Sequence, residues 1–177
     1  TSDHGEEHFD HGFFNHGHRY EDEVVRVPLI IRAPGGRWGA GNWVPYSACH
    51  ADLLPTFLEW FGKKPPWYFE GESLVPLMTG AQTKNRPCYM EFPLAPRRVH
   101  YAYFDGRYKI IRAAYRKHTY MYDLKKDPNE KKRRGRKHKK SKRLLRAMAK
   151  YRFGRPTTID RQRTRLISSH TVISTAL

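Results

Sequence analysis

The sequence predicts an α/β fold, because strand-like and helix-like segments follow one another along the first part of the chain. Residues 24–33 form a near-continuous apolar run rich in β-branched side chains, which is typical of a strand buried on both faces. Residues 54–61 carry an apolar stripe at helical spacing. Residues 101–111 carry Tyr and Ile at alternating positions around Asp105 and Gly106, a pattern that predicts a β-hairpin.

The first 20 residues are dominated by polar side chains. They include five histidines and four carboxylates, with Gly5, Gly12 and Gly17 between them. Glycine at this density favours loops, since it permits tight turns of the backbone near a site. Directly after this loop, residues 21–23 are expected to form a solvated helical turn, with Arg26 paired to one of its carboxylates.

The later elements begin with a helix that we expect to start at Asp52, whose side chain can accept hydrogen bonds from the first turn. Pro55 is tolerated in that turn, and Gly62 is a natural C-terminal stop. The apolar stripe of this helix consists of Leu54, Phe57, Leu58 and Phe61. Residues 119–124 are expected to add a strand to the hairpin, and residues 108–110 to lie at a sheet edge.

The formal net charge of +17 is concentrated near the C-terminus of the 177-residue chain. Residues 1–130 contain 17 Lys and Arg against 16 Asp and Glu, whereas residues 131–165 contain 17 Lys and Arg against the single Asp160. Like-charge repulsion and the lack of apolar side chains favour disorder in residues 131–140. Residues 142–153 are expected to form a helix with one apolar face, made by Leu144, Leu145, Met148 and Tyr151.

The basic segment also predicts a class of partner. Thirteen Lys and Arg lie within residues 131–152 without a carboxylate, so this segment would bind phosphate or sulfate groups electrostatically. No aromatic residue between positions 131 and 150 offers a stacking surface for bases, which argues against recognition of single-stranded nucleic acid. We therefore expect non-specific binding of polyanions.

Short apolar runs and few cysteines exclude several classes of protein. The longest aliphatic stretch, residues 29–31, is far shorter than the roughly 20 apolar residues of a membrane span. No basic segment followed by an apolar one marks a secretory signal. Cys49 and Cys88 are too few for a disulfide framework, and we expect two free thiols. The chain opens on Thr1 without Met, from which we expect a cut end.

Several short motifs occur in a fixed order along the chain. They are Thr1-Ser2-Asp3-His4-Gly5-Glu6, His11-Gly12, His16-Gly17-His18, Arg26-Val27-Pro28-Leu29-Ile30-Ile31, Asp52-Leu53-Leu54-Pro55-Thr56, Gly71-Glu72-Ser73-Leu74, and Tyr122-Asp123-Leu124 followed by Asp127-Pro128-Asn129-Glu130. Each motif is weak alone, but together and in this order they are specific. Over about residues 1–130 the chain resembles the C-terminal half of a sulfatase of the alkaline phosphatase superfamily.

This resemblance implies the C-terminal part of an alkaline-phosphatase-like sandwich, in which helices flank a buried sheet, plus a small antiparallel C-terminal sheet and a basic tail. Residues 1–95 would then belong to the catalytic α/β domain, residues 96–130 to the small antiparallel subdomain, and residues 131–177 to a flexible tail that carries the helix expected over 142–153. The family is mostly secreted, periplasmic or lysosomal, whereas the sequence itself leaves the compartment unknown.

The resemblance further implies metal-dependent hydrolysis of sulfate esters. Sulfatases use a Cys or Ser, in a Cys/Ser-x-Pro-x-Arg context, that is oxidised to formylglycine and serves as the nucleophile. Neither Cys49 nor Cys88 lies in such a context. The nucleophile and the family's N-terminal pair of metal-binding Asp residues are therefore expected in a missing N-terminal half, and the chain alone is expected to be inactive.

By the same resemblance, Asp3 and His4 are expected to bind one divalent metal ion. Oxygen ligands favour Ca²⁺ or Mg²⁺, while imidazole favours Mn²⁺ or Zn²⁺. Sulfatases commonly carry Asp-Asn at this position with calcium, so calcium is the expectation from the family. The imidazole of His4 leaves Mn²⁺, Mg²⁺ and Zn²⁺ open.

His16 and His18 lie in the loop where sulfatases place a Lys or His that contacts the sulfate and assists the leaving group. A cationic or hydrogen-bonding group there would stabilise charge that develops on the ester oxygen. In two-metal relatives a His near this position is itself a ligand. The spacing does not decide between His16 and His18, and His8 and His11 are expected to be structural.

Two alternatives remain open at this point. Some phosphonate and phosphate-ester hydrolases of the superfamily carry the Asp-His form, so the substrate class would then be a phosphodiester or phosphonate ester. The second alternative is a non-enzymatic remnant whose only activity is polyanion binding through residues 131–152.

Overall fold

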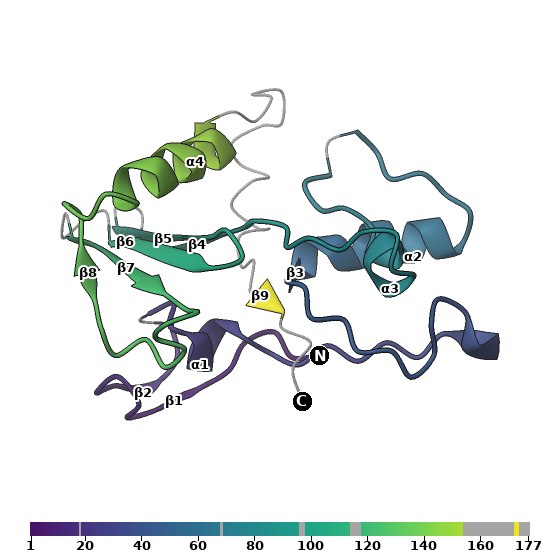
Figure 1. Ribbon diagram of the computed structural model, residues 1–177, viewed down its shortest axis with the longest axis horizontal. Coiled ribbons are helices and arrows are strands. Elements are labelled where there is room, and N and C mark those ends of the chain that lie inside the picture. Colours follow the sequence, from purple (N-terminus) through teal and green to yellow (C-terminus); the bar gives the residue numbers. More distant parts are fainter. Residues whose placement is uncertain (18, 68, 96–97, 114–117, 154–171, 174–177) are drawn as a thin grey trace.

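The computed structural model describes residues 1–177 with the exception of 18, 68, 96–97, 114–117, 154–171 and 174–177. Its largest element is a five-stranded antiparallel sheet with the strand order β4-β5-β6-β7-β8 (Figure 1). These strands are β4 (Cys88–Ala95), β5 (Arg98–Phe104), β6 (Tyr108–Ala113), β7 (His118–Asp123) and β8 (Arg134–Gly135). Helices accompany the sheet, so the predicted α/β class is confirmed.

The other elements are short and lie mostly before the sheet in the chain. The helices are α1 (Asp22–Val25), α2 (Leu53–Trp60), α3 (Val75–Met78) and α4 (Ser141–Phe153), with 3₁₀ turns at Pro34–Gly36 and His50–Asp52. Two small antiparallel ladders pair β1 (Glu7–His8) with β2 (Phe14–Asn15), and β3 (Ala48–Cys49) with β9 (Val172–Ile173). None of the helices within the described residues has the length and apolar character needed to cross a bilayer.

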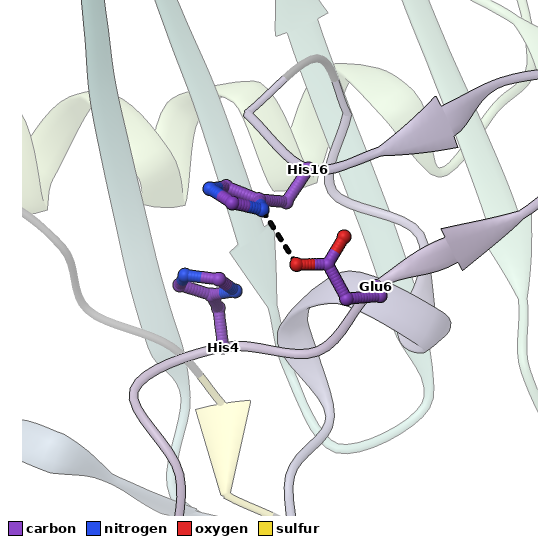
Figure 2. A group of neighbouring side chains, drawn as sticks. All are labelled: His4, Glu6 and His16. Atoms are coloured by element: carbon purple, nitrogen blue, oxygen red, sulfur yellow. Dashed lines mark hydrogen bonds and ion pairs between the residues drawn. The ribbon is translucent and has the colours of Figure 1, made fainter.

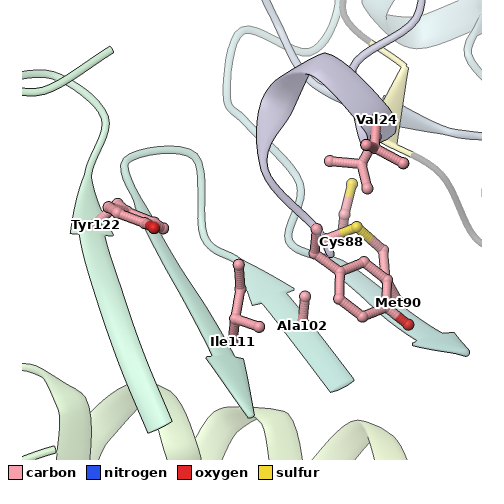
Figure 3. Close-up of a cluster of buried hydrophobic side chains, with 8 residues drawn as sticks. Val24, Cys88, Met90, Ala102, Ile111 and Tyr122 are labelled. Carbon is pink, nitrogen blue, oxygen red and sulfur yellow. The ribbon is translucent and has the colours of Figure 1, made fainter. Parts of the chain in front are cut away.

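The sheet is covered on both faces. Figure 1 shows α4 over one face and the N-terminal segment with α1 beneath the other. Because successive side chains of a strand point to opposite faces, Cys88 and Met90 pack with Val24 of α1 (Figure 3). Tyr89, which lies between them in β4, packs with Leu144 of α4 on the other face. The cluster on the α1 face comprises Tyr20, Val24, Val25, Cys88, Met90, Ala102, Ile111 and Tyr122. The cluster on the α4 face comprises Tyr89, Tyr101, Tyr103, Ile110, Met121, Leu144 and Met148.

The hairpin predicted around Asp105 is confirmed as β5 and β6, and the following strand as β7. One carboxylate oxygen of Asp105 accepts from the amides of Arg107 (3.0 Å) and Tyr108 (2.7 Å), which fixes the turn. Gly106 has φ +96°, and a Cβ there would lie 2.6 Å from the Cβ of Asn85. The sheet begins with β4, so it starts before residue 96, where the sequence analysis placed a boundary.

The strand expected over residues 24–33 does not form. Val24 and Val25 lie in α1 and bury their side chains against the sheet. Val27 is buried in a separate hydrophobic cluster, and Ile30 is exposed. A β-branched run favours a strand only where a neighbouring strand completes the hydrogen bonds. Here the valines adopt a helical turn instead, because this turn lets their side chains pack against the sheet.

The apolar stripe expected on the helix after Asp52 is present but faces outward. Leu54, Phe57 and Phe61 are 50%, 47% and 77% exposed. The buried face of α2 is instead that of Pro55 and Thr56. The side chain of Thr56 donates to the carbonyl of Asp52 (2.6 Å) and accepts from the amide of Leu74 (2.8 Å), so polar contacts set the orientation of the helix.

Asp52 itself does not cap α2 with its side chain. Its two carboxylate oxygens accept from the amides of Cys49 (2.9 Å) and Glu72 (2.9 Å), and the guanidinium of Arg86 lies 3.9 Å away. Asp52 therefore joins two loops, rather than satisfying the helix terminus that the sequence suggested.

Cys49 and Cys88 form a disulfide, so the expectation of two free thiols is wrong. Their Cα atoms lie 6.4 Å apart although 39 positions separate them in the sequence. The bond joins β3 to the first residue of β4. Two cysteines that are distant in sequence meet only through the tertiary fold, so spacing could not reveal the pair.

The basic segment is folded over much of its length, in contrast to the flexible tail that we expected. Asp127 accepts from the amides of Lys131 (3.0 Å) and Lys132 (2.8 Å), and β8 pairs with β7. Ser141 and Leu144 of α4 are fully buried, because the helix lays its apolar face on the sheet. The end of the expected tail, residues 154–171 and 174–177, lies outside the described residues.

A buried ion cluster connects the N-terminal segment to the sheet. Lys109 lies in β6, a central strand and not the expected edge, and its side chain is almost fully buried. Its ammonium lies 2.6 Å from Asp22 of α1 and 2.7 Å from Glu130. The carboxylate of Glu130 also accepts from the amide of Asp22 (2.6 Å). Burial, partly opposed by the ammonium of Lys109, raises the pKa of Glu130 to about 7.

Replacing Lys109 with Met should leave two carboxylates without their buried counter-charge. We expect the free energy of unfolding at neutral pH to fall by about 3–5 kcal/mol, measured by urea denaturation. The deficit relative to the parent should shrink as the pH is lowered from about 9 to about 6. Without the ammonium of Lys109, the folded-state pKa of Glu130 lies above the value of about 7 that it has in the parent, so the folded variant takes up a proton at a higher pH than the folded parent does.

The matched control is Arg26→Met, which removes the exposed partner of the same Asp22 (3.6 Å). This ion pair is open to solvent, so its loss should cost less than about 1 kcal/mol. Equal effects of the two substitutions would contradict the structural role of the buried cluster.

A second prediction concerns the disulfide between Cys49 and Cys88. Thiol titration of the unfolded, unreduced protein should detect no free cysteine, and reduction should release both. Replacing both Cys49 and Cys88 with Ala should lower the free energy of unfolding by about 4 kcal/mol, the loop-closure estimate for a ring of this length. Thiols that react before reduction would contradict the pairing.

Candidate functional site

A pocket lies between the N-terminal segment and the edge of the sheet formed by β4 and β5. Its volume is about 120 Å³. Residues from three stretches of sequence line it: Asp3, His4, His16, Gly17, Arg19, Tyr20, Val24, Val25, Glu91, Phe92 and His100. Three of the four predicted site residues are among them, and the fourth, His18, lies outside the described residues.

Local backbone geometry brings the polar side chains together. In the ladder of β1 and β2, Glu7 pairs with Asn15, which places Glu6 beside His16. The amide of Gly5 donates to the carbonyl of Val24 (2.8 Å). A Cβ at Gly5 would lie 2.1 Å from the carbonyl oxygen of Glu23, so only glycine allows this approach. The segment that carries Asp3 and His4 is thereby held against α1.

His4, Glu6 and His16 form a compact cluster, shown in Figure 2. One potential ligand atom from each of the three residues lies within 4.8 Å of the others. The rings of His4 and His16 are 4.0 Å apart between centroids. Nδ1 of His16 lies 2.7 Å from a carboxylate oxygen of Glu6. Of the residues that the structure describes, these form the group of three His or acidic side chains that could hold a metal ion.

The hydrogen bonds of the two histidines define which nitrogen is available. Nδ1 of His4 lies 2.9 Å from the carbonyl of Gly5, which can only accept, so Nδ1 carries the proton. Nε2 of His4 lies 3.5 Å from a carboxylate oxygen of Asp3 and is left to bind a ligand or a second proton. By the same argument Nδ1 of His16 donates to Glu6, and Nε2 of His16 is left to bind a ligand or a second proton.

Asp3 is well exposed and ionised. Its own backbone amide and then the neighbouring His4 lower the pKa of this carboxyl. A carboxylate oxygen and an imidazole nitrogen together are a donor set that suits a divalent cation. The separation of 3.5 Å is short enough for one ion to contact both atoms.

His8 and His11 lie away from this cluster. His8 is exposed and packs its ring against Phe14. His11 is buried, where Nδ1 contacts the carboxylate of Glu23 and Nε2 donates to the carbonyl of Glu130 (3.1 Å). The contacts of His11 are thus those of a structural residue.

The opposite wall of the pocket comes from residues that the sequence analysis did not single out. Phe92 of β4 and His100 of β5 are direct partners in the sheet. The hydroxyl of Tyr20 donates to the carbonyl of His100 (3.2 Å), and burial keeps the pKa of Tyr20 well above its usual value. The alternation of residues along β5 could have indicated the position of His100. His100 and Ala102 lie on one face of the sheet, and the tyrosines on which the hairpin was predicted lie on the other.

Arg19 supplies a positive charge at the base of the pocket. Its guanidinium lies 3.5 Å from Glu21 and 4.0 Å from Glu7, and it covers the ring of Phe13. Both carboxylates are fully buried, and burial raises the pKa of Glu7 against the opposing charge of Arg19. Residues 21–23, which we expected to form a solvated turn, therefore contribute one buried carboxylate, that of Glu21. This carboxylate also accepts from the hydroxyl of Tyr122 (2.9 Å).

Comparison with known proteins places this chain in a family. Residues 9–152 match the family described as N-sulphoglucosamine sulphohydrolase, C-terminal. The match continues through the basic segment, beyond residue 130 where the predicted resemblance ended.

Two curated proteins are similar to this chain in sequence. The N-acetylglucosamine-6-O-sulfatase of Bacteroides thetaiotaomicron is 33% identical over 145 residues, which cover 73% of this chain and 25% of the relative. The multifunctional alkaline phosphatase superfamily protein PehA of Trinickia caryophylli is 29% identical over 147 residues, which cover 73% of this chain and 28% of the relative. A solved putative sulfatase from Bacteroides thetaiotaomicron has a TM-score of 0.48 at 29% identity, over 57% of this chain and 23% of that one.

The chain thus spans about a quarter of the length of the curated relatives that it matches. The family match covers most of the chain, and the predicted resemblance to sulfatases is confirmed. This protein belongs to the N-sulphoglucosamine sulphohydrolase C-terminal family, and by resemblance it is related to the sulfuric ester hydrolases.

Proposed function

We propose that this chain forms the C-terminal part of a metal-dependent sulfatase that hydrolyses sulfate esters of sugars. The observation that carries the proposal is the pair of Asp3 and His4 at the pocket, with the carboxylate oxygen and the imidazole Nε2 3.5 Å apart. The sugar substrate is supported by a relative named as an N-acetylglucosamine-6-O-sulfatase.

In this proposal Asp3 and His4 are ligands of one divalent ion, calcium by family resemblance, with Mn²⁺, Mg²⁺ and Zn²⁺ as the other candidates. A bound ion would polarise the sulfate oxygens and offset charge that develops on them. The remaining ligands and the formylglycine nucleophile would come from a segment outside these 177 residues. This agrees with the fraction of its relatives that the chain covers.

His16 is the better candidate for assisting the leaving group. Glu6 accepts from Nδ1 of His16 and orients the ring, so a proton on Nε2 would be directed away from Glu6. Donation of this proton to the ester oxygen would neutralise charge as the bond to sulfur breaks. The same role for His18 stays a prediction.

A second candidate substrate class is a phosphodiester or phosphonate ester. The observation that favours it is His4 at a position where sulfatases commonly carry Asn. A further point in its support is the relative named as a multifunctional member of the alkaline phosphatase superfamily. A nucleophile other than a formylglycine precursor in the longer protein would favour this class.

The disulfide supports an oxidising compartment, such as the secreted, periplasmic or lysosomal locations of the family. Recovery of the protein from its source with Cys49 and Cys88 paired would agree with this location.

Metal binding can be tested on the chain alone by titration with Mn²⁺ while the histidine ring signals are observed by NMR. We expect paramagnetic broadening of His4 and His16 well before that of the exposed His8. Asp3→Ala should weaken binding at least about tenfold, because it removes one of the two direct ligands. The matched control is Asp10→Ala, an exposed carboxylate of the same loop, which should leave the titration unchanged. Equal broadening of all histidines would contradict the site.

Catalysis gives a separate test. The purified 177-residue chain should not turn over an aryl sulfate, because the proposed nucleophile lies elsewhere. Turnover by the chain alone that is abolished by Asp3→Ala would contradict this division of the active site.

A further inference from the structure

The basic segment forms an ordered cationic surface. Gly135 of β8 pairs with Tyr120 of β7, and its carbonyl accepts from the amide of His138 (3.0 Å). Leu144 and Met148 then fix α4 on the sheet by burying their side chains. The exposed Lys and Arg of this surface are Lys131, Lys132, Arg133, Arg136, Lys137, Lys139, Lys142, Arg143, Arg146 and Lys150.

Only some of these charges have a partner among the described residues. Arg133 lies 3.6 Å from Glu21 and donates to Tyr122, Arg143 pairs with Asp105, and Lys131 donates to the carbonyl of Asp10. The other seven form no ion pair within the part of the chain that the structure describes. Residues 131–152 contain no carboxylate that could neutralise them locally. Seven uncompensated cations repel one another, and an anionic partner would relieve this repulsion.

Three of the cations form a regular row. Lys142, Arg146 and Lys150 lie four positions apart on the outer side of α4, and all three are exposed. Residues at this spacing share one face of a helix and follow one another by about 6 Å along its axis. A rigid row of cations at regular intervals matches a linear polymer that carries anionic groups along its length.

The row of cations on α4 is remote from the pocket, whereas Lys131 and Arg133 of the same surface contact Asp10 and Glu21. α4 covers the face of the sheet opposite to α1 and the N-terminal segment that carries His4 and His16 (Figure 1). It therefore cannot contact the ester that is hydrolysed. A ligand that occupies both places has to be long enough to pass around the edge of the sheet.

We propose that the cationic surface is a second binding site for a sulfated polysaccharide, which holds the polymer at a distance from the pocket where one ester is hydrolysed. The proposal rests on the proposed function for the choice of a sulfated polymer. Nucleic acid is the other polyanion that the charge would attract, but residues 131–150 contain no aromatic side chain on which bases could stack. The cations would contact the sulfate groups, and added salt would weaken binding.

The test is the affinity of the 177-residue chain for a labelled heparin oligosaccharide of defined length, measured by fluorescence anisotropy. Lys142→Gln, Arg146→Gln and Lys150→Gln are introduced together on α4. The matched control replaces Lys63, Lys64 and Lys84, which are also exposed, so that the net charge is the same. We expect the α4 variant to bind at least about tenfold more weakly and with a smaller salt dependence, and the control to change less than about twofold.

Equal loss in the two triple variants would overturn the proposal, because net charge alone would then explain the binding. A single-stranded DNA oligonucleotide of equal charge that binds as tightly as heparin would also overturn it. Circular dichroism should be the same for both variants, since all six side chains are exposed. The triple variant on α4 should give the same Mn²⁺ titration of His4 and His16 as the parent, so a failure of the metal site and a failure of the cationic surface are distinguishable.

Discussion

The ion cluster of Lys109, Asp22 and Glu130 connects three distant parts of the chain, and the geometry of the pocket depends on it. Lys109 belongs to the middle of the sheet, Asp22 to the N-terminal segment, and Glu130 to the connection between β7 and β8. A buried ammonium requires partners, since removing it from water without them is costly. The cluster therefore fixes where α1 lies, and the close approach of Gly5 to Val24 then positions Asp3 and His4.

The residues of this site fall into two groups with different roles. Glu6 and the carbonyl of Gly5 orient the two histidines and determine which nitrogen is available. Phe92 and His100 close the opposite side and belong to the sheet. The proposed metal-binding pair is thus on a loop, while its surroundings are on regular strands. The other face of the same sheet carries α4 and its row of cations, so one sheet separates the proposed catalytic and polymer-binding surfaces.

Local patterns predicted the parts of this structure that depend on neighbouring residues. The hairpin around Asp105, the strand before Leu124 and the helix after residue 141 form largely as the sequence indicated. Predictions from local patterns were wrong where contacts with residues distant in the sequence determine the structure. The valines of α1 pack as a helical turn, the stripe of Phe57 and Phe61 faces outward, and Cys49 meets Cys88. The motifs identified Asp3, His4 and His16, but His100 and the ion partners of Lys109 became apparent only when the sheet was assembled.

The central claim is that the N-terminal segment packs under the sheet in this chain, so that the site residues face β4 and β5. The most direct measurement is a nuclear Overhauser experiment on the 177-residue protein. The ring of Phe92 lies close to Gly17, and we predict cross-peaks between the α-protons of Gly17 and this ring. The same spectra of Lys109→Met should lose these cross-peaks while those between β5 and β6 remain. Their absence in the parent protein, with random-coil shifts for residues 1–17, would contradict the account.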